Sequence, residues 1–150
     1  MRVSNQWVVD ASVALKWYFR DEELRSQADS LLGAFALGVA TLTAPSFIRY
    51  EIANAFVVAQ RRGRLSSEQL LPRLESFFAL DIVYPGENEE FFHSAVELTK
   101  RVPVAFYDAL YLALAQRLAF NFVTADRQLH ERTKDELPWV VWLGNLDVNP

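Results

Sequence analysis

Four acidic residues stand in apolar surroundings, and their type and spacing point to cation chemistry. Asp10 and Asp126 each come just after a short apolar run, while Glu51 and Asp108 lie inside alanine-rich stretches with a helical pattern. Aspartate and glutamate are rarely buried without a compensating charge. No lysine or arginine adjoins Asp10 or Asp108 in the sequence. A bound cation is therefore the simplest partner for these carboxylates.

Asp108 has the most apolar neighbours of the four acids. It is the only charged residue between Val102 and Ala115, and its helical neighbours three and four positions away are Val104, Ala105, Tyr111 and Leu112. Burying it alone would cost several kcal/mol or force it to be protonated, so we expect it to belong to a functional site. Glu51 has an alternative role, an ion pair with Arg49 or Arg62 at the rim of such a site.

Asp10 and Asp126 share a second pattern, because each stands between an apolar strand and a helix. Aspartate directly before a helix is a common N-cap, so capping is the structural alternative for both. The carboxyl end of a parallel strand is also where open α/β sheets bind their ligands. Ser12 and Thr124 stand two residues from these acids, and we expect them to support the site by hydrogen-bonding a carboxylate or a metal-bound water, or to act as ordinary caps.

The wide spacing of the acids, from residue 10 to residue 126, excludes a local loop site such as an EF-hand. No GxSxG, HExxH or glycine-rich phosphate loop occurs, and His93 and His130 lie in charged helical stretches. Cysteine is absent, which excludes disulfides, thiolate catalysis and cysteine-bound zinc. We expect two aspartates from strand ends and two acids from helices to converge at one edge of a sheet.

The densest basic stretch is Arg61, Arg62 and Arg64 around Gly63. These side chains either contact nucleic-acid phosphates or form a solvated helix end, where positive charge suits the helix dipole. The net charge of −4 and the pI near 5.2 argue against a protein that holds nucleic acid through a broad basic field.

The elements that must position these residues follow from the hydrophobic period. It predicts strands over residues 6–10, 40–44, 81–83, 121–124 and 139–142. It predicts helices over residues 11–18, 22–37, 46–62, 68–78, 87–100, 104–118 and 126–132. Apolar strands alternating with helices are typical of a parallel sheet covered on both faces. The predicted class is α/β, a three-layer α/β/α sandwich with a central, mostly parallel sheet.

The length of 150 residues fits one domain, residues 1–150. Hydrophobic residues make up 51% of the chain, more than a small core requires, so we expect self-association. The uncharged stretch from Ser30 to Ile48 approaches the length of a membrane span, but its glycines and Pro45 indicate a helix end, a strand and a new helix. Without a secretory signal or cysteines, the expected compartment is the cytoplasm.

The four acidic motifs together resemble those of the PIN-domain ribonucleases, and within them the VapC-like toxins of toxin–antitoxin pairs. The residues that carry the resemblance are 8–12 (VVDAS), 44–55 (APSFIRYEIANA), 107–113 (YDALYLA) and 123–126 (VTAD). It extends from about Trp7 to Leu143. It implies a PIN-like sandwich, a homodimer, Mg²⁺ or Mn²⁺ in the acidic pocket, endonucleolytic cleavage of RNA, and inhibition by a cognate antitoxin.

The chemistry of the acids agrees with this resemblance. Oxygen ligands suit Mg²⁺ or Mn²⁺, and a metal held by carboxylates activates water and stabilises the charge that builds on a phosphodiester. Asp10, Glu51, Asp108 and Asp126 are accordingly assigned to catalysis and metal binding. Such a site would hydrolyse RNA in the manner of a metal-dependent endoribonuclease.

Two other functions remain open at this point. One is a metal-dependent phosphatase with Asp10 as its nucleophile, although Ser12 stands where such enzymes place a second aspartate. The other is a non-catalytic interaction protein whose acidic pocket binds a basic peptide. Release of phosphate from a small phosphomonoester favours the first, and intact RNA with tight peptide binding favours the second.

Overall fold

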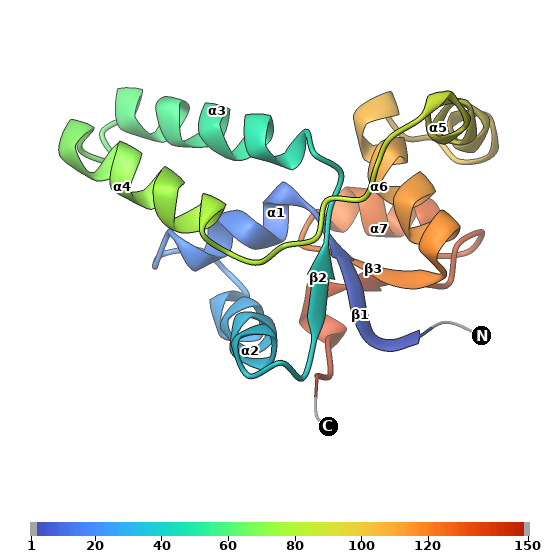
Figure 1. Ribbon diagram of the computed structural model, residues 1–150, viewed down its shortest axis with the longest axis horizontal. Helices are drawn as coiled ribbons and strands as arrows, with labels where there is room; N and C mark the ends of the chain where they lie inside the picture. Colours follow the sequence, from blue (N-terminus) through green and yellow to red (C-terminus); the bar gives the residue numbers. More distant parts are fainter. Residues whose placement is uncertain (1–2, 149–150) are drawn as a thin grey trace.

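Short apolar segments pair as a parallel β-sheet in the computed structural model, which describes residues 3–148. In this part of the chain the strand order is β2-β1-β3-β4, with bounds Val3–Val9 (β1), Thr41–Thr43 (β2), Phe120–Thr124 (β3) and Val140–Trp142 (β4). Because both faces are covered, the strands carry fully buried side chains, namely Val8, Val9, Leu42, Phe122 and Val123. The predicted α/β class is confirmed (Figure 1).

The helices surround this sheet as Figure 1 shows, with α3 and α4 forming a hairpin that extends beyond it. Their bounds are Ala11–Ala14 (α1), Arg25–Ala36 (α2), Ile48–Arg61 (α3), Ser67–Phe78 (α4), Glu89–Arg101 (α5), Phe106–Leu118 (α6) and Arg127–Thr133 (α7). Short 3₁₀ helices follow α1 and β4, at Leu15–Trp17 (η1) and Leu143–Asn145 (η2).

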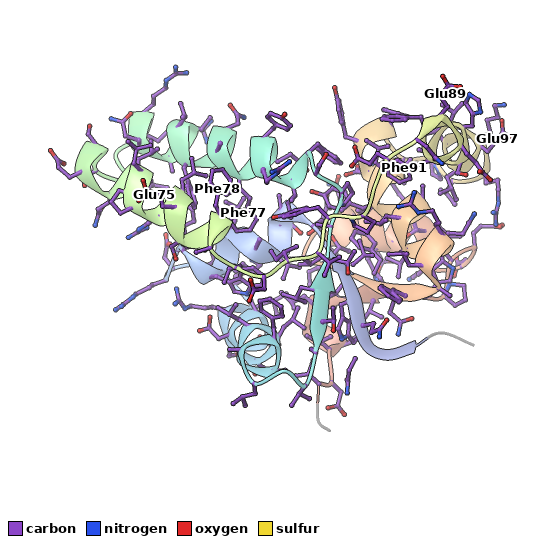
Figure 2. The ribbon with its side chains drawn as sticks, viewed as in Figure 1. Glu75, Phe77, Phe78, Glu89, Phe91 and Glu97 are labelled. Atoms are coloured by element: carbon purple, nitrogen blue, oxygen red, sulfur yellow. The ribbon has the colours of Figure 1, made fainter. Side chains whose placement is uncertain are left out.

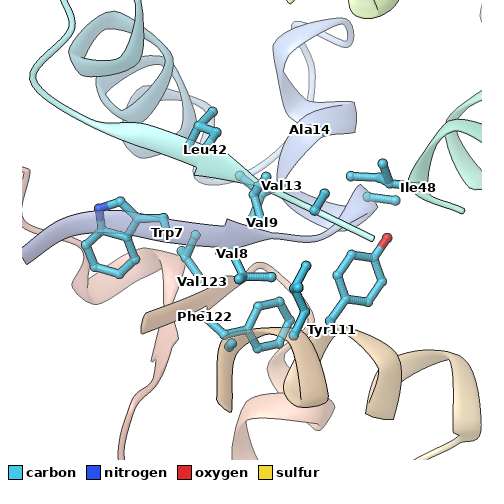
Figure 3. Packing of buried hydrophobic residues seen from close by; sticks show 14 of the residues in the cluster. Trp7, Val8, Val9, Val13, Ala14, Leu42, Ile48, Tyr111, Phe122 and Val123 are labelled. Carbon is cyan, nitrogen blue, oxygen red and sulfur yellow. The ribbon is translucent and has the colours of Figure 1, made fainter. Parts of the chain in front are cut away.

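The core continues from one face of the sheet to the other. Figure 3 shows Val13 and Ala14 of α1 on one side of β1, and Tyr111 of α6 with Phe122 of β3 on the other. The rings of Tyr111 and Phe122 are stacked, with centroids 5.8 Å apart. Successive strand residues point to opposite faces, so one strand joins both helical layers. The result is the predicted α/β/α sandwich.

The α3–α4 hairpin is anchored on the chain that follows η1. Phe77, labelled in Figure 2, is fully buried, and its ring centroid lies 6.4 Å from that of Tyr18. A capping box at Ser66 and Gln69 fixes the start of α4. The hairpin therefore has a defined position relative to α1 and η1.

Strand register brings the carboxyl ends of the inner strands together. Val9 of β1 pairs with Val123 of β3, so Asp10 and Thr124 follow at the same level of the sheet. Val8 of β1 pairs with Thr43 of β2 on the other side. The loops that follow all these strands consequently share one edge.

One predicted strand is wrong. Residues 81–83 form only an isolated bridge between Thr43 and Val83, with the Val83 amide donating to Leu42 O at 2.9 Å. Pro45 and Pro85 each stand two residues after the bridge, one on each of the two segments. Neither has an amide hydrogen to donate, so the pairing does not extend.

The predicted helices are present with shifted ends. The predicted helix over 11–18 divides into α1 and η1, and the helix over 22–37 begins at Arg25, after Leu24 in the left-handed conformation (φ 59°). The helix over 104–118 begins at Phe106, because Ala105 is extended. Ser30 to Ile48 contains the end of α2, β2 and the start of α3, as expected. Within residues 3–148, no helix is long and apolar enough to cross a membrane.

Candidate active site at the carboxyl edge of the sheet

Asp10 is the buried centre of this edge, with 6% of its surface exposed. Its Oδ1 accepts hydrogen bonds from the Ser12 hydroxyl at 2.5 Å and the Val13 amide at 3.2 Å, which makes it the N-cap of α1. Its Oδ2 accepts a hydrogen bond from the Thr124 hydroxyl at 2.6 Å. Asp10 therefore has both the capping role and the strand-end position considered from the sequence.

The charge of Asp10 has no basic partner within 4 Å in the part of the chain that the structure describes. Burial raises the pKa of this carboxyl to about 6, although the bonds from Ser12, Thr124 and Val13 favour the ionised form. The negative charge of Glu51 raises the pKa of Asp10 further. At neutral pH the buried carboxylate is ionised and uncompensated, as a cation ligand would be.

Ser12 and Thr124 join the ends of the two inner strands. The Ala125 amide donates to the Ser12 hydroxyl oxygen at 2.9 Å, and the Asp126 amide donates to the Thr124 hydroxyl oxygen at 3.0 Å. Each hydroxyl thus accepts from the β3 loop while donating to Asp10. The position of the carboxylate is fixed by both strands.

Glu51 comes from the first turn of α3 and is held by α6. The Tyr111 hydroxyl donates to Glu51 Oε1 at 2.5 Å, and Figure 3 shows this hydroxyl directed toward the start of α3 near Ile48. The ion pair with Arg49 or Arg62 considered above is absent among the described residues. Glu51 is therefore oriented toward the edge of the sheet by a neutral donor.

Tyr111 is the site residue that the sequence interpretation missed. It is 2% exposed, and its ring packs 5.0 Å from that of Phe47 and 5.8 Å from that of Phe122. Burial and the charge of Glu51 raise its pKa well above 10, so it remains a donor. Its one sequence signal is its place three residues after Asp108, on the same helical face.

Each of the first three acids has its pKa raised by the negative charge of the next acid in the sequence. Partial burial is the main reason that the pKa values of Glu51 and Asp108 are raised. The charge of Asp108 adds to the effect on Glu51, and that of Asp126 adds to the effect on Asp108. Because such interactions weaken with distance, the predicted residues lie in one neighbourhood.

The burial expected of Asp108 from its apolar neighbours is only partial. Only Asp10 is buried, whereas Glu51 and Asp108 are half-buried and Asp126 is exposed. Asp126 caps α7 through its Oδ1, which accepts from the Leu129 amide at 3.1 Å. Solvent therefore reaches the three outer acids at this edge, whereas Asp10 lies beneath the surface.

The donor set fits a hard divalent cation by its chemistry, since every candidate ligand is a carboxylate without a basic partner within 4 Å in the described residues. The side chains are not closed around a point, because no three His, Asp or Glu side chains in the described part of the chain have the geometry of a metal site. Side-chain rotations of the exposed acids would have to bring them together.

The basic stretch lies away from this edge. Arg61 ends α3, about 15 Å from Glu51 at 1.5 Å per helical residue. Arg64 is paired with Asp21 at 3.0 Å and Glu22 at 3.1 Å. Arg61 and Arg62 are exposed. The structure therefore separates the three predicted phosphate contacts from the acidic residues.

Comparison with known sequences identifies the fold family. A family model described as the PIN domain matches residues 7–135. The chain belongs to the PIN-domain family. This PIN domain is 32% identical over 128 residues to ribonuclease VapC3 of Pyrobaculum aerophilum, an alignment that covers 83% of this chain and 92% of the relative.

Solved structures share the fold of this PIN domain. VapC20 of Mycobacterium tuberculosis, described as a sarcin-ricin loop cleaving toxin, has a TM-score of 0.63 at 13% identity and covers 85% of this chain and 95% of its own. PAE2754 from Pyrobaculum aerophilum has a TM-score of 0.59 at 23% identity, and the match covers 95% of this chain and 87% of PAE2754. A chain of a toxin–antitoxin complex from Klebsiella pneumoniae has a TM-score of 0.56 at 15% identity, and the match covers 89% of this chain and 94% of that chain.

Proposed function

We propose that residues 1–150 are a single nuclease domain that hydrolyses RNA phosphodiester bonds with Mg²⁺ or Mn²⁺. The observation that carries this proposal is Asp10, a buried carboxylate at the end of an inner parallel strand with no basic partner within 4 Å in residues 3–148. A buried carboxylate requires a compensating positive charge. The similarity to a protein named ribonuclease VapC3 supports RNA as the substrate.

Asp10, Glu51, Asp108 and Asp126 would hold the ion. When bound, the ion lowers the pKa of water and stabilises charge on a phosphodiester. Ser12 and Thr124 hold the Asp10 carboxylate in place, and the Tyr111 hydroxyl donates a hydrogen bond to one carboxylate oxygen of Glu51. Without positive charge the acids would repel the phosphates of RNA, so occupancy of the site also controls substrate binding.

We further propose that the protein is the toxin of a toxin–antitoxin pair in the cytoplasm. One relative is a VapC ribonuclease, and a structure with the same fold belongs to a toxin–antitoxin complex. The same uncompensated acids would accept a basic side chain from an antitoxin. A cation and an antitoxin would then compete for one site, which gives inhibition a physical basis.

A homodimer is proposed on the basis of exposed apolar side chains. Figure 2 shows Glu89 and Glu97 on the outer side of α5, whereas Phe91 faces the molecule and is buried. Beside them α5 and α6 expose large apolar side chains, namely Phe92, Val96, Phe106 and Tyr107. Apolar side chains gathered on one surface are typical of a protein interface.

Arg61, Arg62 and Arg64 are proposed as RNA contacts outside the catalytic edge. Their distance from Glu51 suits phosphates further along the strand rather than the cleaved bond. Phosphate contacts of this kind position a nucleic acid without reading its sequence.

The experiment that tests the function compares cleavage of total cellular RNA by the wild type, by Asp108→Asn and by the matched control Asp81→Asn. Asp81 is exposed and lies outside the acidic edge. We expect cleavage by the wild type and by Asp81→Asn in Mg²⁺ or Mn²⁺, none in EDTA, and none by Asp108→Asn. Release of phosphate from a small phosphomonoester, or tight binding of a basic peptide with RNA left intact, would replace the nuclease by one of the alternatives above.

A further inference from the structure

A cavity of about 530 Å³ lies outside the acidic edge, at the chain between η1 and α2. Four arginines line it: Arg20 from this connection, Arg25 from the start of α2, Arg64 from the α3–α4 turn and Arg73 from α4. The chain as a whole has a net charge of −4. Such a concentration of arginines in an acidic protein indicates a site for an anion.

The acids around the cavity pair with only two of these four arginines. Arg64 is paired with Asp21 and Glu22, and Arg25 with Asp29. Arg20 and Arg73 have no carboxylate within 4 Å in the part of the chain that the structure describes. Positive charge therefore exceeds negative charge at this cavity.

Two of the arginines are held in place while retaining donors. Arg73 Nη1 donates to the Tyr18 carbonyl at 2.8 Å, which fixes its guanidinium against the cavity wall. Arg25 Nε donates to Asp29 at 3.2 Å, while its Nη1 is buried without a hydrogen-bond partner. A buried donor without a partner destabilises the folded state, because it has lost its hydrogen bonds to water. An anion in the cavity would offer the guanidinium acceptors after a small rotation of the side chain.

The arginine cavity shares two lining residues, Phe19 and Arg64, with a second cavity. That second cavity, of about 300 Å³, lies between η1 and α3. The wall of this second cavity includes Arg62 and Asn54, and Asn54 lies one helical turn after Glu51. Figure 1 shows α1 beneath α3, between β1 and the chain that leads to α2. A strand that runs from Glu51 along α3 would therefore pass the second cavity, whose shared residues Phe19 and Arg64 also line the arginine cavity.

We propose that the arginine cavity binds a backbone phosphate of the RNA strand, a few nucleotides from the bond that is cleaved. Planar guanidinium groups match the geometry of phosphate oxygens. The inference rests on the proposed nuclease function and adds a site that sets the position of the strand. Because a free phosphate ion has the same chemistry, the test separates the two sources.

The test uses RNA binding without cleavage. Fluorescence anisotropy of a labelled single-stranded RNA is measured with the Asp108→Asn protein in Mg²⁺ over a series of KCl concentrations. Into this background are introduced Arg20→Gln/Arg73→Gln and, as a control with the same charge change, Lys100→Gln/Arg101→Gln at the end of α5. Arg20 is exposed, so Arg20→Gln alone serves if the double variant does not fold.

We expect roughly tenfold weaker binding at low salt for the cavity variant, equivalent to about 1.4 kcal/mol, because hydrogen bonds from charged donors to a phosphate are lost. The slope of log affinity against log salt should become shallower by about 0.7 for each phosphate that the variant no longer neutralises. The control should change neither quantity by more than the difference between replicates. Equal effects of the cavity and control variants would overturn the proposal, because they would reflect net charge alone.

A second arm measures thermal melting in inorganic phosphate against chloride at matched ionic strength. Stabilisation by phosphate that disappears in the cavity variant, combined with unchanged RNA binding, would overturn the proposal in favour of a free-phosphate site. Weaker RNA binding by the cavity variant supports it. If the wild type does not cleave RNA, and neither it nor the two variants change the anisotropy of the labelled RNA, the nuclease function itself fails. That result differs from a failure of the cavity proposal alone, in which the protein still binds RNA but the cavity variant binds it as tightly as the control.

Discussion

The Thr124 hydroxyl at the end of β3 donates a 2.6 Å hydrogen bond to Oδ2 of Asp10 at the end of β1. The two residues are 114 positions apart in the sequence. This bond, with that from Ser12, fixes both carboxylate oxygens of the only buried acid at the edge. The geometry of the candidate site therefore depends on the pairing of two strands as well as on the acids themselves.

Thr124→Val tests this dependence, because it keeps the shape of the side chain and removes the donor. The hydrogen bond favours ionised Asp10, so its loss should raise the pKa of Asp10 above about 6 and move the acidic limb of the pH–rate profile upward. Stability at pH 8 should fall by about 1.5–3 kcal/mol, the range for hydrogen bonds to charged groups. Urea unfolding and RNA cleavage between pH 5 and 8 measure both effects.

The matched control for this change is Thr41→Val, at an exposed position of β2. It should leave both the profile and the stability close to those of the wild type. An unmoved pH profile in Thr124→Val would mean that ionisation of Asp10 does not limit cleavage.

Asp10→Asn should stabilise the metal-free protein in a pH-dependent way. Because burial raises the pKa of Asp10 from 3.8 to about 6, the folded state binds more protons than the unfolded state between these values, and stability falls as pH rises through them. The penalty reaches about 3 kcal/mol at pH 7. The free energy of unfolding of the variant should therefore equal that of the wild type near pH 4. It should exceed the wild-type value by a growing amount up to about pH 6, and by a constant amount at higher pH.

Urea unfolding in EDTA at pH 4, 5, 6 and 8 measures this difference, with Asp81→Asn as the exposed control. A loss of stability in Asp10→Asn that is the same at every pH would show that the cap of α1 matters more than the buried charge.

The elements and the order of the acids could be predicted because both are local properties of the sequence. The junction at Asp10, an apolar strand followed directly by a helix, identifies its place at a sheet edge. The bridge at Val83 could not be predicted, since its length is limited by Pro45 and Pro85 on two separate segments. The burial of Asp108 was overestimated from its hydrophobic neighbours along one helix. Those neighbours do not show whether other parts of the chain cover the first turn of that helix.

Tyr111→Phe tests the contact that could not be predicted, since the partner of Tyr111 is 60 positions away. The hydrogen bond to Glu51 favours its ionised form, so removing the hydroxyl should raise the pKa of Glu51 and reduce metal-dependent cleavage at pH 6 more than at pH 8. The ring stays in its packing position, so stability should fall by only about 1 kcal/mol.

Cleavage rates at the two pH values, with thermal melts, measure the effect of Tyr111→Phe. Tyr50→Phe is its control, because Tyr50 is 73% exposed on the same helix as Glu51. Equal losses of activity at pH 6 and pH 8 would assign Tyr111 to packing alone.

Mg²⁺ or Mn²⁺ should stabilise the wild type, and the gain should shrink sharply in Asp10→Asn/Asp108→Asn. A ligand that binds only the folded state contributes about 2.7 kcal/mol at one hundred times its dissociation constant, a shift that is visible in a thermal melt. KCl at matched ionic strength should not reproduce it, because diffuse screening does not replace coordination. Zinc should bring no special preference, since the chain has no cysteine. A melt that millimolar Mg²⁺ and Mn²⁺ leave unmoved, or an equal shift in the double variant, would exclude a shared metal site and leave binding of a basic segment as the role of the four acids.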